Sequence, residues 1–232
     1  PMPRFPSLAA FLLCVLPALA TAAPVLRPID GFTDEANAQL AAFLGKTEDH
    51  AGRKVAVFDG DGTVLGQTPH YLADECMYEH AVAHPGRKRE LLAHMGSIRN
   101  VSMEYVTGRV QYLAGERVED VREMGRKCFA ERYSGKIFAP SRALIDLLED
   151  NGFEVWVITG SPQVLYQGFL SEQLDIPMTN IVGVHSIIRD GVITDDIVQP
   201  VTQDHGKREA IETVVQACPL LVAGNSRGDK EM

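Results

Sequence analysis

The chain has 232 residues, of which 45% are hydrophobic and 23% are charged, as in an ordinary globular protein that buries a sizeable core. Its formal net charge of −9 gives no electrostatic attraction to nucleic acid or to an anionic membrane surface. We therefore expect neither as a partner and a small molecule as the ligand. The length predicts one domain, or one domain with an insertion.

The first 22 residues differ in pattern from the rest. Arg4 stands in a short leading segment, an apolar run covers about residues 8–20, and small residues lead up to Ala22. The run is too short to span a membrane and is interrupted by Pro17. Residues 1–22 therefore predict a signal peptide, with a mature chain that is secreted or periplasmic and has no membrane association after cleavage.

The rest of the chain alternates between helical and strand patterns. We expect a helix from Thr33, a strand over 54–58 and polar-faced helices over about 68–134. The later elements are a helix over 139–152, a strand over 153–159, a helix over 161–174, a strand over 180–184, a hairpin over 186–194, a helix over 206–217 and a strand over 219–225. This alternation predicts an α/β fold, with a parallel sheet covered by helices on both faces.

The ends and the cysteines give two further expectations. The sequence starts at Pro1 and stops at Met232, in what resembles the first turn of a helix, so we expect a fragment. Removal of the signal peptide would leave Cys76, Cys128 and Cys218, an odd number that allows at most one internal disulfide. Cys76 with Cys128 is the candidate pair because both lie in the predicted helical segment. Separate buried thiols are the alternative.

Each of the three apolar strands runs into a polar loop at its carboxyl end. These loops read "DGDGT", "TGSP" and "GNSRGD". In open parallel sheets ligands bind outside those carboxyl ends, so we expect the functional residues there. A solvated turn would explain Asp59 and Asp61 taken alone. After so apolar a strand, two carboxylates are costly unless a cation compensates them, and magnesium accepts such oxygen ligands.

Four segments, "VFDGDGT", "VITGS", "GK" and "GNSRGD", resemble in this order the signature motifs of the haloacid dehalogenase superfamily. The likeness runs from about Val55 to the end and is closest to the phosphoserine phosphatase-like branch, which includes exported bacterial phosphatases. It implies a Rossmann-like core over 23–67 and 137–232, truncated at its carboxyl end, with a helical cap inserted over 68–136. It also implies Mg²⁺-dependent hydrolysis of a small phosphomonoester through an aspartyl-phosphate.

The resemblance gives the motif residues their roles. Asp59 would be the nucleophile and a metal ligand. Asp61 would protonate the leaving oxygen, then deprotonate the attacking water, and would also face the metal through its backbone carbonyl. Lys207 would compensate the charges of Asp59 and the phosphoryl group. Thr159 would donate a hydrogen bond to a phosphoryl oxygen, or else make only a local backbone bond.

The fourth motif departs from the family pattern. Asn225 stands where the family usually has its first aspartate, whereas the second aspartate is kept as Asp229. Both are predicted metal ligands. An amide oxygen can bind magnesium but carries no charge, so the affinity for the metal should be lower than in the usual site.

Three residues are predicted to bind the substrate: Gly160, Ser161 and Arg109. Ser161 could instead be the N-cap of the following helix. Arg109 lies where the branch has a carboxylate-binding arginine, and a solvated surface arginine is the alternative. Thr68 stands by count where phosphoserine phosphatases carry a glutamate, so we do not expect phosphoserine itself. His70 and Tyr71 lie at the entry to the predicted cap, near the expected leaving group.

Two other functions remain open besides the phosphomonoesterase. Asp61 argues against a dehalogenase, which lacks the second aspartate, and against a phosphonatase, which needs a lysine in its cap. One alternative is transfer of the phosphoryl group to an acceptor other than water. The other is a catalytically silent protein that binds a phosphate ligand, which the substitution at Asn225 suggests. The sequence predicts no particular oligomeric state.

Overall fold

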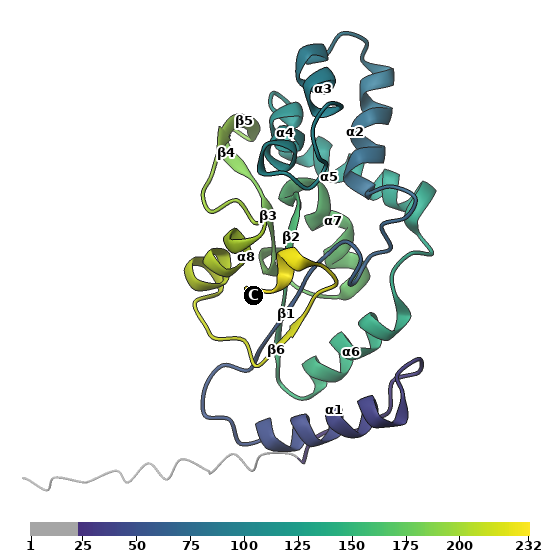
Figure 1. The fold of residues 1–232 in the computed structure, drawn as a ribbon, viewed down its shortest axis with the longest axis vertical. Coiled ribbons are helices and arrows are strands. Elements are labelled where there is room, and N and C mark those ends of the chain that lie inside the picture. Colours follow the sequence, from purple (N-terminus) through teal and green to yellow (C-terminus); the bar gives the residue numbers. More distant parts are fainter. Residues whose placement is uncertain (1–22) are drawn as a thin grey trace, which may run out of the picture.

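The computed structural model describes residues 23–232, and the predicted signal peptide lies outside these residues. Within this part of the chain, no helix combines the length and the apolar character needed to cross a bilayer. Figure 1 shows a sheet in the middle of the molecule, with the helix of residues 34–47 at one end and the helices between residues 72 and 128 gathered at the other.

The central sheet has four parallel strands in the order β3-β2-β1-β6. They are β1 (Val55–Phe58), β2 (Glu154–Pro162), β3 (Ile181–Val184) and β6 (Leu221–Ala223). The predicted parallel sheet is thus confirmed. Because β1 lies between β2 and β6 in parallel register, the loops that follow these three strands meet at one edge of the sheet.

Helices cover both faces of this sheet, as the sequence predicts. They are α1 (Asp34–Thr47), α6 (Ala139–Asp150), α7 (Gln163–Leu174) and α8 (His205–Ala210), which continues as a π-helical turn over Ile211–Val215. Alternate residues of β1 point to opposite faces. Ala56 and Phe58 join the larger core with α6 and α7, whereas Val55 and Val57 pack in a second core with the segment from Ala210 onward.

The region between β1 and α6 is helical, as predicted. It contains α2 (Leu72–Ala83), α3 (Arg89–Met95), α4 (Met103–Leu113), α5 (Val118–Cys128) and a π-helical turn over Phe129–Tyr133. α5 packs against α7 of the core, and α4 packs against β2. The close approach of α5 requires Gly125, because a Cβ there would lie 2.1 Å from the carbonyl oxygen of Leu165.

The structure confirms the hairpin and corrects one boundary. β4 (Ser186–Arg189) pairs with β5 (Val192–Ile197) across Asp190 and Gly191, both of which have a positive φ, as this turn requires. β2 extends through Pro162, so the expected strand end at 159 and helix start at 161 are wrong. The loop "TGSP" continues the strand because it pairs with β3 at Pro162.

Cys76 of α2 and Cys128 of α5 form a disulfide, with their Cα atoms 5.9 Å apart, and Cys218 is an exposed free thiol. The candidate pair is therefore confirmed, and the alternative of separate thiols is wrong. The disulfide joins two helices that are 52 residues apart in the sequence.

Loss of this disulfide should destabilise the protein. We expect the Cys76→Ala/Cys128→Ala variant to lose about 4 kcal/mol of free energy of unfolding, because the link restricts a loop of this length in the unfolded chain. Urea unfolding measures the difference. Cys218→Ser is the matched control and should leave stability unchanged. A loss below about 1 kcal/mol in the double variant would contradict the prediction.

Candidate active site

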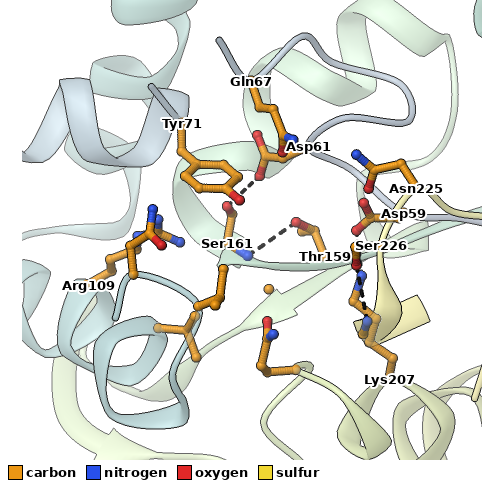
Figure 2. Close-up of a pocket in the computed structure, with 16 residues that line it drawn as sticks. Asp59, Asp61, Gln67, Tyr71, Arg109, Thr159, Ser161, Lys207, Asn225 and Ser226 are labelled. Carbon is orange, nitrogen blue, oxygen red and sulfur yellow. Dashed lines mark hydrogen bonds and ion pairs between the residues drawn. The ribbon is translucent and has the colours of Figure 1, made fainter. Parts of the chain in front are cut away.

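One pocket lies at the carboxyl ends of the central strands, where the sequence predicts the functional residues (Figure 2). Most of the predicted site residues line it: Asp59, Asp61, Arg109, Thr159, Gly160, Ser161, Lys207 and Asn225. They come from the loop after β1, from β2, from α4, from the start of α8 and from the loop after β6. Asp229 is the predicted site residue that does not line the pocket.

Lys207 connects two buried carboxylates. Its ammonium group donates to Oδ1 of Asp59 and to Oδ1 of Asp229, each at 2.5 Å. All three side chains are less than 10% exposed. Gly206 permits this arrangement, because a Cβ there would lie 1.8 Å from the carbonyl oxygen of Val201. The glycine lets the start of α8 approach the sheet edge and brings Lys207 to Asp59.

Burial and charge oppose each other at this ion pair. Burial raises the pKa of Asp59 to about 6, although Lys207 acts to lower it. Burial lowers the pKa of Lys207, but the carboxylates of Asp59 and Asp229 outweigh this and hold it above its ordinary value. At neutral pH both partners are therefore charged. Among the described residues, the only hydrogen-bond partner of Asp59 Oδ2 is the hydroxyl of Thr63, at 3.5 Å.

Two hydroxyl groups hold the carboxylate of Asp61. Ser161 Oγ donates to Oδ2 at 2.7 Å, and the phenol of Tyr166 donates to Oδ1 at 2.9 Å. Burial raises the pKa of Asp61, and the hydrogen bond from Ser161 opposes the rise. Ser161 belongs to β2, and the N-cap of α7 is Pro162, so the N-cap alternative for Ser161 is wrong.

Thr159 is buried at the pocket wall, and the local bond considered for it is present. Its hydroxyl oxygen accepts a hydrogen bond from the backbone N–H of Ser161 at 3.1 Å. The hydroxyl hydrogen stays available to a ligand oxygen in the pocket. Gly60 makes room for this side chain, because a Cβ at Gly60 would lie 2.9 Å from Thr159 Oγ1. Gly160 is also closely packed, because a Cβ at this position would lie 2.5 Å from Gln203 Oε1.

The carboxylate of Asp229, which the sequence predicts to be a metal ligand, is instead occupied by hydrogen bonds from the protein. Its Oδ2 accepts from the backbone N–H of Asn225 at 3.1 Å, and from the N–H and hydroxyl of Ser226 at 2.8 and 2.9 Å. With Lys207 on Oδ1, the carboxylate already accepts four hydrogen bonds, which is about its full capacity. Asp229 therefore fixes Lys207 and the loop after β6, and we assign it no metal.

The remaining oxygen donors suit a magnesium ion. The side chains of Asp59 and Asn225 line the same pocket and offer the hard oxygen atoms that this ion prefers. Gly62 keeps the amide there, because a Cβ at Gly62 would lie 1.8 Å from Asn225 Nδ2. Within residues 23–232, no three His, Cys, Asp or Glu side chains are grouped as a metal site. An ion here would therefore depend on amide and backbone oxygens as well as carboxylates.

Arg109 is buried in the pocket wall, so the solvated-surface alternative is wrong. It is 3% exposed, and it forms a two-point ion pair with Asp74 of α2, from Nε to Oδ1 at 2.8 Å and from Nη2 to Oδ2 at 3.0 Å. Tyr105 also donates to Asp74, at 3.0 Å. The guanidinium lies over the rings of Tyr71 and Tyr105, with its carbon 5.1 and 4.9 Å from the ring centroids.

Several pocket residues lie outside the motifs that sequence reasoning could use. They are Gln67, Asn100, Val101, Val106 and Gln203, whereas Ser226 lies in the fourth motif but received no predicted role. Tyr71 lines the pocket, as expected, but His70 and Thr68 do not. Tyr166 was also missed, because in an amphipathic helix pattern it is indistinguishable from a core aromatic residue.

The comparisons with known proteins identify the family. The family model described as haloacid dehalogenase-like hydrolase matches residues 56–232, which is most of the chain. The protein therefore belongs to the haloacid dehalogenase-like hydrolases. A Mycobacterium leprae protein named as a hydrolase is 26% identical over 103 residues, which are 44% of this chain and 33% of that protein. The match thus spans about a third of the length of this curated relative.

Solved structures share the fold at low sequence identity. A protein of unknown function from Anaerococcus prevotii has a TM-score of 0.65 at 13% identity, over 88% of this chain and 83% of the other. Cytosolic 5′-nucleotidase IIIB bound to cytidine has a TM-score of 0.55 at 16% identity, over 84% and 72%. These similarities confirm the predicted α/β fold.

Proposed function

We propose that this protein hydrolyses a small phosphomonoester by way of an aspartyl-phosphate on Asp59. The observation that carries the proposal is the arrangement around this carboxylate. One oxygen of Asp59 is held by Lys207, while the other has, within residues 23–232, only the hydroxyl of Thr63 as a distant hydrogen-bond partner. Asp61 lines the same pocket. The family match supports a hydrolase.

In this mechanism, Oδ2 of ionised Asp59 attacks phosphorus, and the bond from phosphorus to the alcohol oxygen breaks. Protonated Asp61 gives its proton to that oxygen, and its raised pKa favours the protonated form that this step needs. Asp61 then takes a proton from the water that attacks the phosphoenzyme, which releases phosphate and restores Asp59. Thr159 donates its hydroxyl hydrogen to a phosphoryl oxygen, and Lys207 balances the charge of Asp59.

A magnesium ion would be held by Asp59, the backbone carbonyl of Asp61 and the amide oxygen of Asn225. When bound, it would supply positive charge to the phosphoryl oxygens. The charges of the site support the need for it, because three carboxylates face two cations in its buried ion pairs even when Asp61 is protonated. A phosphate dianion would be repelled unless this excess negative charge were balanced.

We also propose that residues 68–136 act as a cap that closes over the substrate, and that the mature protein works outside the cytoplasm. This region supplies Arg109 of α4 and Tyr71, the N-cap of α2, to the lining of the pocket, as a cap would. The disulfide between Cys76 and Cys128 suits an oxidising compartment, such as a periplasm.

Hydrolysis of p-nitrophenyl phosphate by the purified chain, with Mg²⁺ or with a chelator, tests the proposal. We expect turnover with Mg²⁺ and its loss on chelation. Absence of turnover, together with calorimetric binding of phosphate esters, would favour the silent binding protein. Phosphoryl transfer to added alcohols in preference to water would favour a phosphotransferase.

Asn225 provides a separate prediction about the metal. Asn225→Asp adds a charged oxygen of the same shape beside Asp59, so the Mg²⁺ concentration for half-maximal activity should fall about tenfold, which corresponds to about 1.4 kcal/mol. Turnover at saturating Mg²⁺ should change little. Asn225→Ala is the matched control and should raise the requirement. An unchanged requirement in both variants would show that Asn225 is not a ligand.

A further inference from the structure

The charges of the pocket indicate which alcohol the substrate carries, provided that the proposed phosphatase function holds. Among the described residues, the charged side chains that line the pocket are Asp59, Asp61, Arg109 and Lys207. Both cations already have carboxylate partners within the protein. Lys207 is bound by Asp59 and Asp229, and Arg109 is bound by Asp74.

Arg109 is the cation remote from the phosphate-binding residues. Figure 2 shows it across the pocket from Asp59 and Lys207, on the same side as Tyr71. Asp74 takes two of its three guanidinium nitrogens, and the pair is almost fully buried. A substrate carboxylate would have to displace Asp74, leaving a buried charge without its partner, or else lie beside it as a second negative charge.

The other lining residues offer no further cation for a negatively charged leaving group. They are neutral amide, hydroxyl, phenol or apolar side chains, and glycines. Such groups can bond to hydroxyl or carbonyl groups of a ligand and pack against its carbon atoms. A negatively charged ligand group in the same place would lose its hydration without gaining a cation that is not already paired.

We infer that the substrate is a phosphomonoester of an alcohol that carries no negative charge, such as a polyol, a sugar or a nucleoside. Asp74 sets this preference by neutralising Arg109. It does not line the pocket and acts through the guanidinium that does, so it is a positioning residue. The inference replaces the predicted role of Arg109 as a carboxylate-binding group, because the carboxylate is supplied by the protein itself.

Two esters that differ in one group test the inference. Glycerol 2-phosphate and 2-phosphoglycerate carry the phosphate on the same carbon and differ by a hydroxymethyl group in place of a carboxylate. With the purified chain and Mg²⁺, we expect kcat/KM to be at least tenfold higher for glycerol 2-phosphate. Equal or higher kcat/KM for 2-phosphoglycerate would overturn the inference.

The role of Asp74 is tested by removing charge in two steps. Asp74→Asn frees the charge of Arg109, so the preference for the neutral ester should fall at least tenfold. Asp74→Asn/Arg109→Gln removes both charges and should restore the preference. Thermal unfolding checks that each variant is folded. An unchanged preference in folded Asp74→Asn would exclude the role of Asp74. The comparison of the two esters on the unmodified protein does not depend on whether a variant folds.

Failure of the proposed phosphatase function can be distinguished from failure of this inference. If p-nitrophenyl phosphate and both esters are left intact, the phosphatase proposal fails. Calorimetric binding of the two esters to the unmodified protein with Mg²⁺ then decides the inference. Tighter binding of glycerol 2-phosphate would support it, and binding of 2-phosphoglycerate that is as tight or tighter would overturn it.

Discussion

Asp59→Asn is expected to lower kcat for p-nitrophenyl phosphate by at least about a thousandfold, because the amide that replaces the carboxylate cannot attack phosphorus. The fold should be retained, since the amide has the same shape and still accepts a hydrogen bond from Lys207. Steady-state kinetics and thermal unfolding, measured on the same preparation, separate the two effects. Hydrolysis above a trace level would show that Asp59 is not the nucleophile.

Asp61→Asn is the matched control for this variant. The amide oxygen can still accept a hydrogen bond from Ser161 or from Tyr166, but the group that transfers protons is removed. With a good leaving group, Asp61→Asn should form the phosphoenzyme and then hydrolyse it slowly, whereas Asp59→Asn should form none. Rapid-quench measurement of bound phosphate distinguishes them. Absence of phosphoenzyme in Asp61→Asn would contradict its role in the second step.

Lys207→Met is expected to cost stability as well as activity. It leaves the carboxylates of Asp59 and Asp229 buried side by side without a cation, and loss of one partner from a buried ion pair costs about 3–5 kcal/mol. The pKa of Asp59 should rise further above 6, because the attraction of Lys207 now acts to lower it. Urea unfolding at pH 7 measures the loss of stability.

The pH dependence of this loss carries a definite sign. A carboxylate whose pKa is raised on folding makes the protein less stable as the pH rises through its unfolded value, near 3.8, towards its folded value. Lys207→Met should therefore lose less stability at pH 5 than at pH 7. Lys207→Met/Asp229→Asn removes one of the two negative charges and should recover part of the loss at pH 7. A Lys207→Met protein as stable as the original at pH 7 would rule out the buried ion pair.

The motif residues were predictable because local features place them. The run "VAVF" is apolar enough to form the buried strand β1, and Asp59 follows it directly. Thr159 lies in the second half of β2, on the carboxyl side of another apolar run. Parallel pairing of the two strands then brings their carboxyl ends together, whatever the details of packing. Lys207 needed the order of the motifs in addition, since a lysine at the start of a helix is usually solvated.

Other features depended on contacts between distant segments. Tyr166 contacts Asp61 from 105 residues away, and nothing in the pattern of α7 separates it from core aromatic residues. Asp229 has the spacing of a metal ligand, but the fold of its own loop supplies enough N–H and hydroxyl donors to occupy it. Hydrogen-bond saturation is a property of three-dimensional neighbours and is invisible in a motif.

The sequence by itself determined the parallel α/β fold, the edge of the sheet that carries the site, and the identity of Asp59, Asp61, Thr159 and Lys207 as its residues. The fold, the edge and the first three residues follow from the order of apolar strands and from the polar residues at their ends, which are local properties of the chain. Lys207 follows only from the resemblance to the ordered motifs of the family. Only the tertiary structure decided the state of Arg109, because its partner Asp74 lies on another helix, 35 residues away. Whether a buried charge is free or neutralised depends on which side chains helix packing brings within hydrogen-bonding distance.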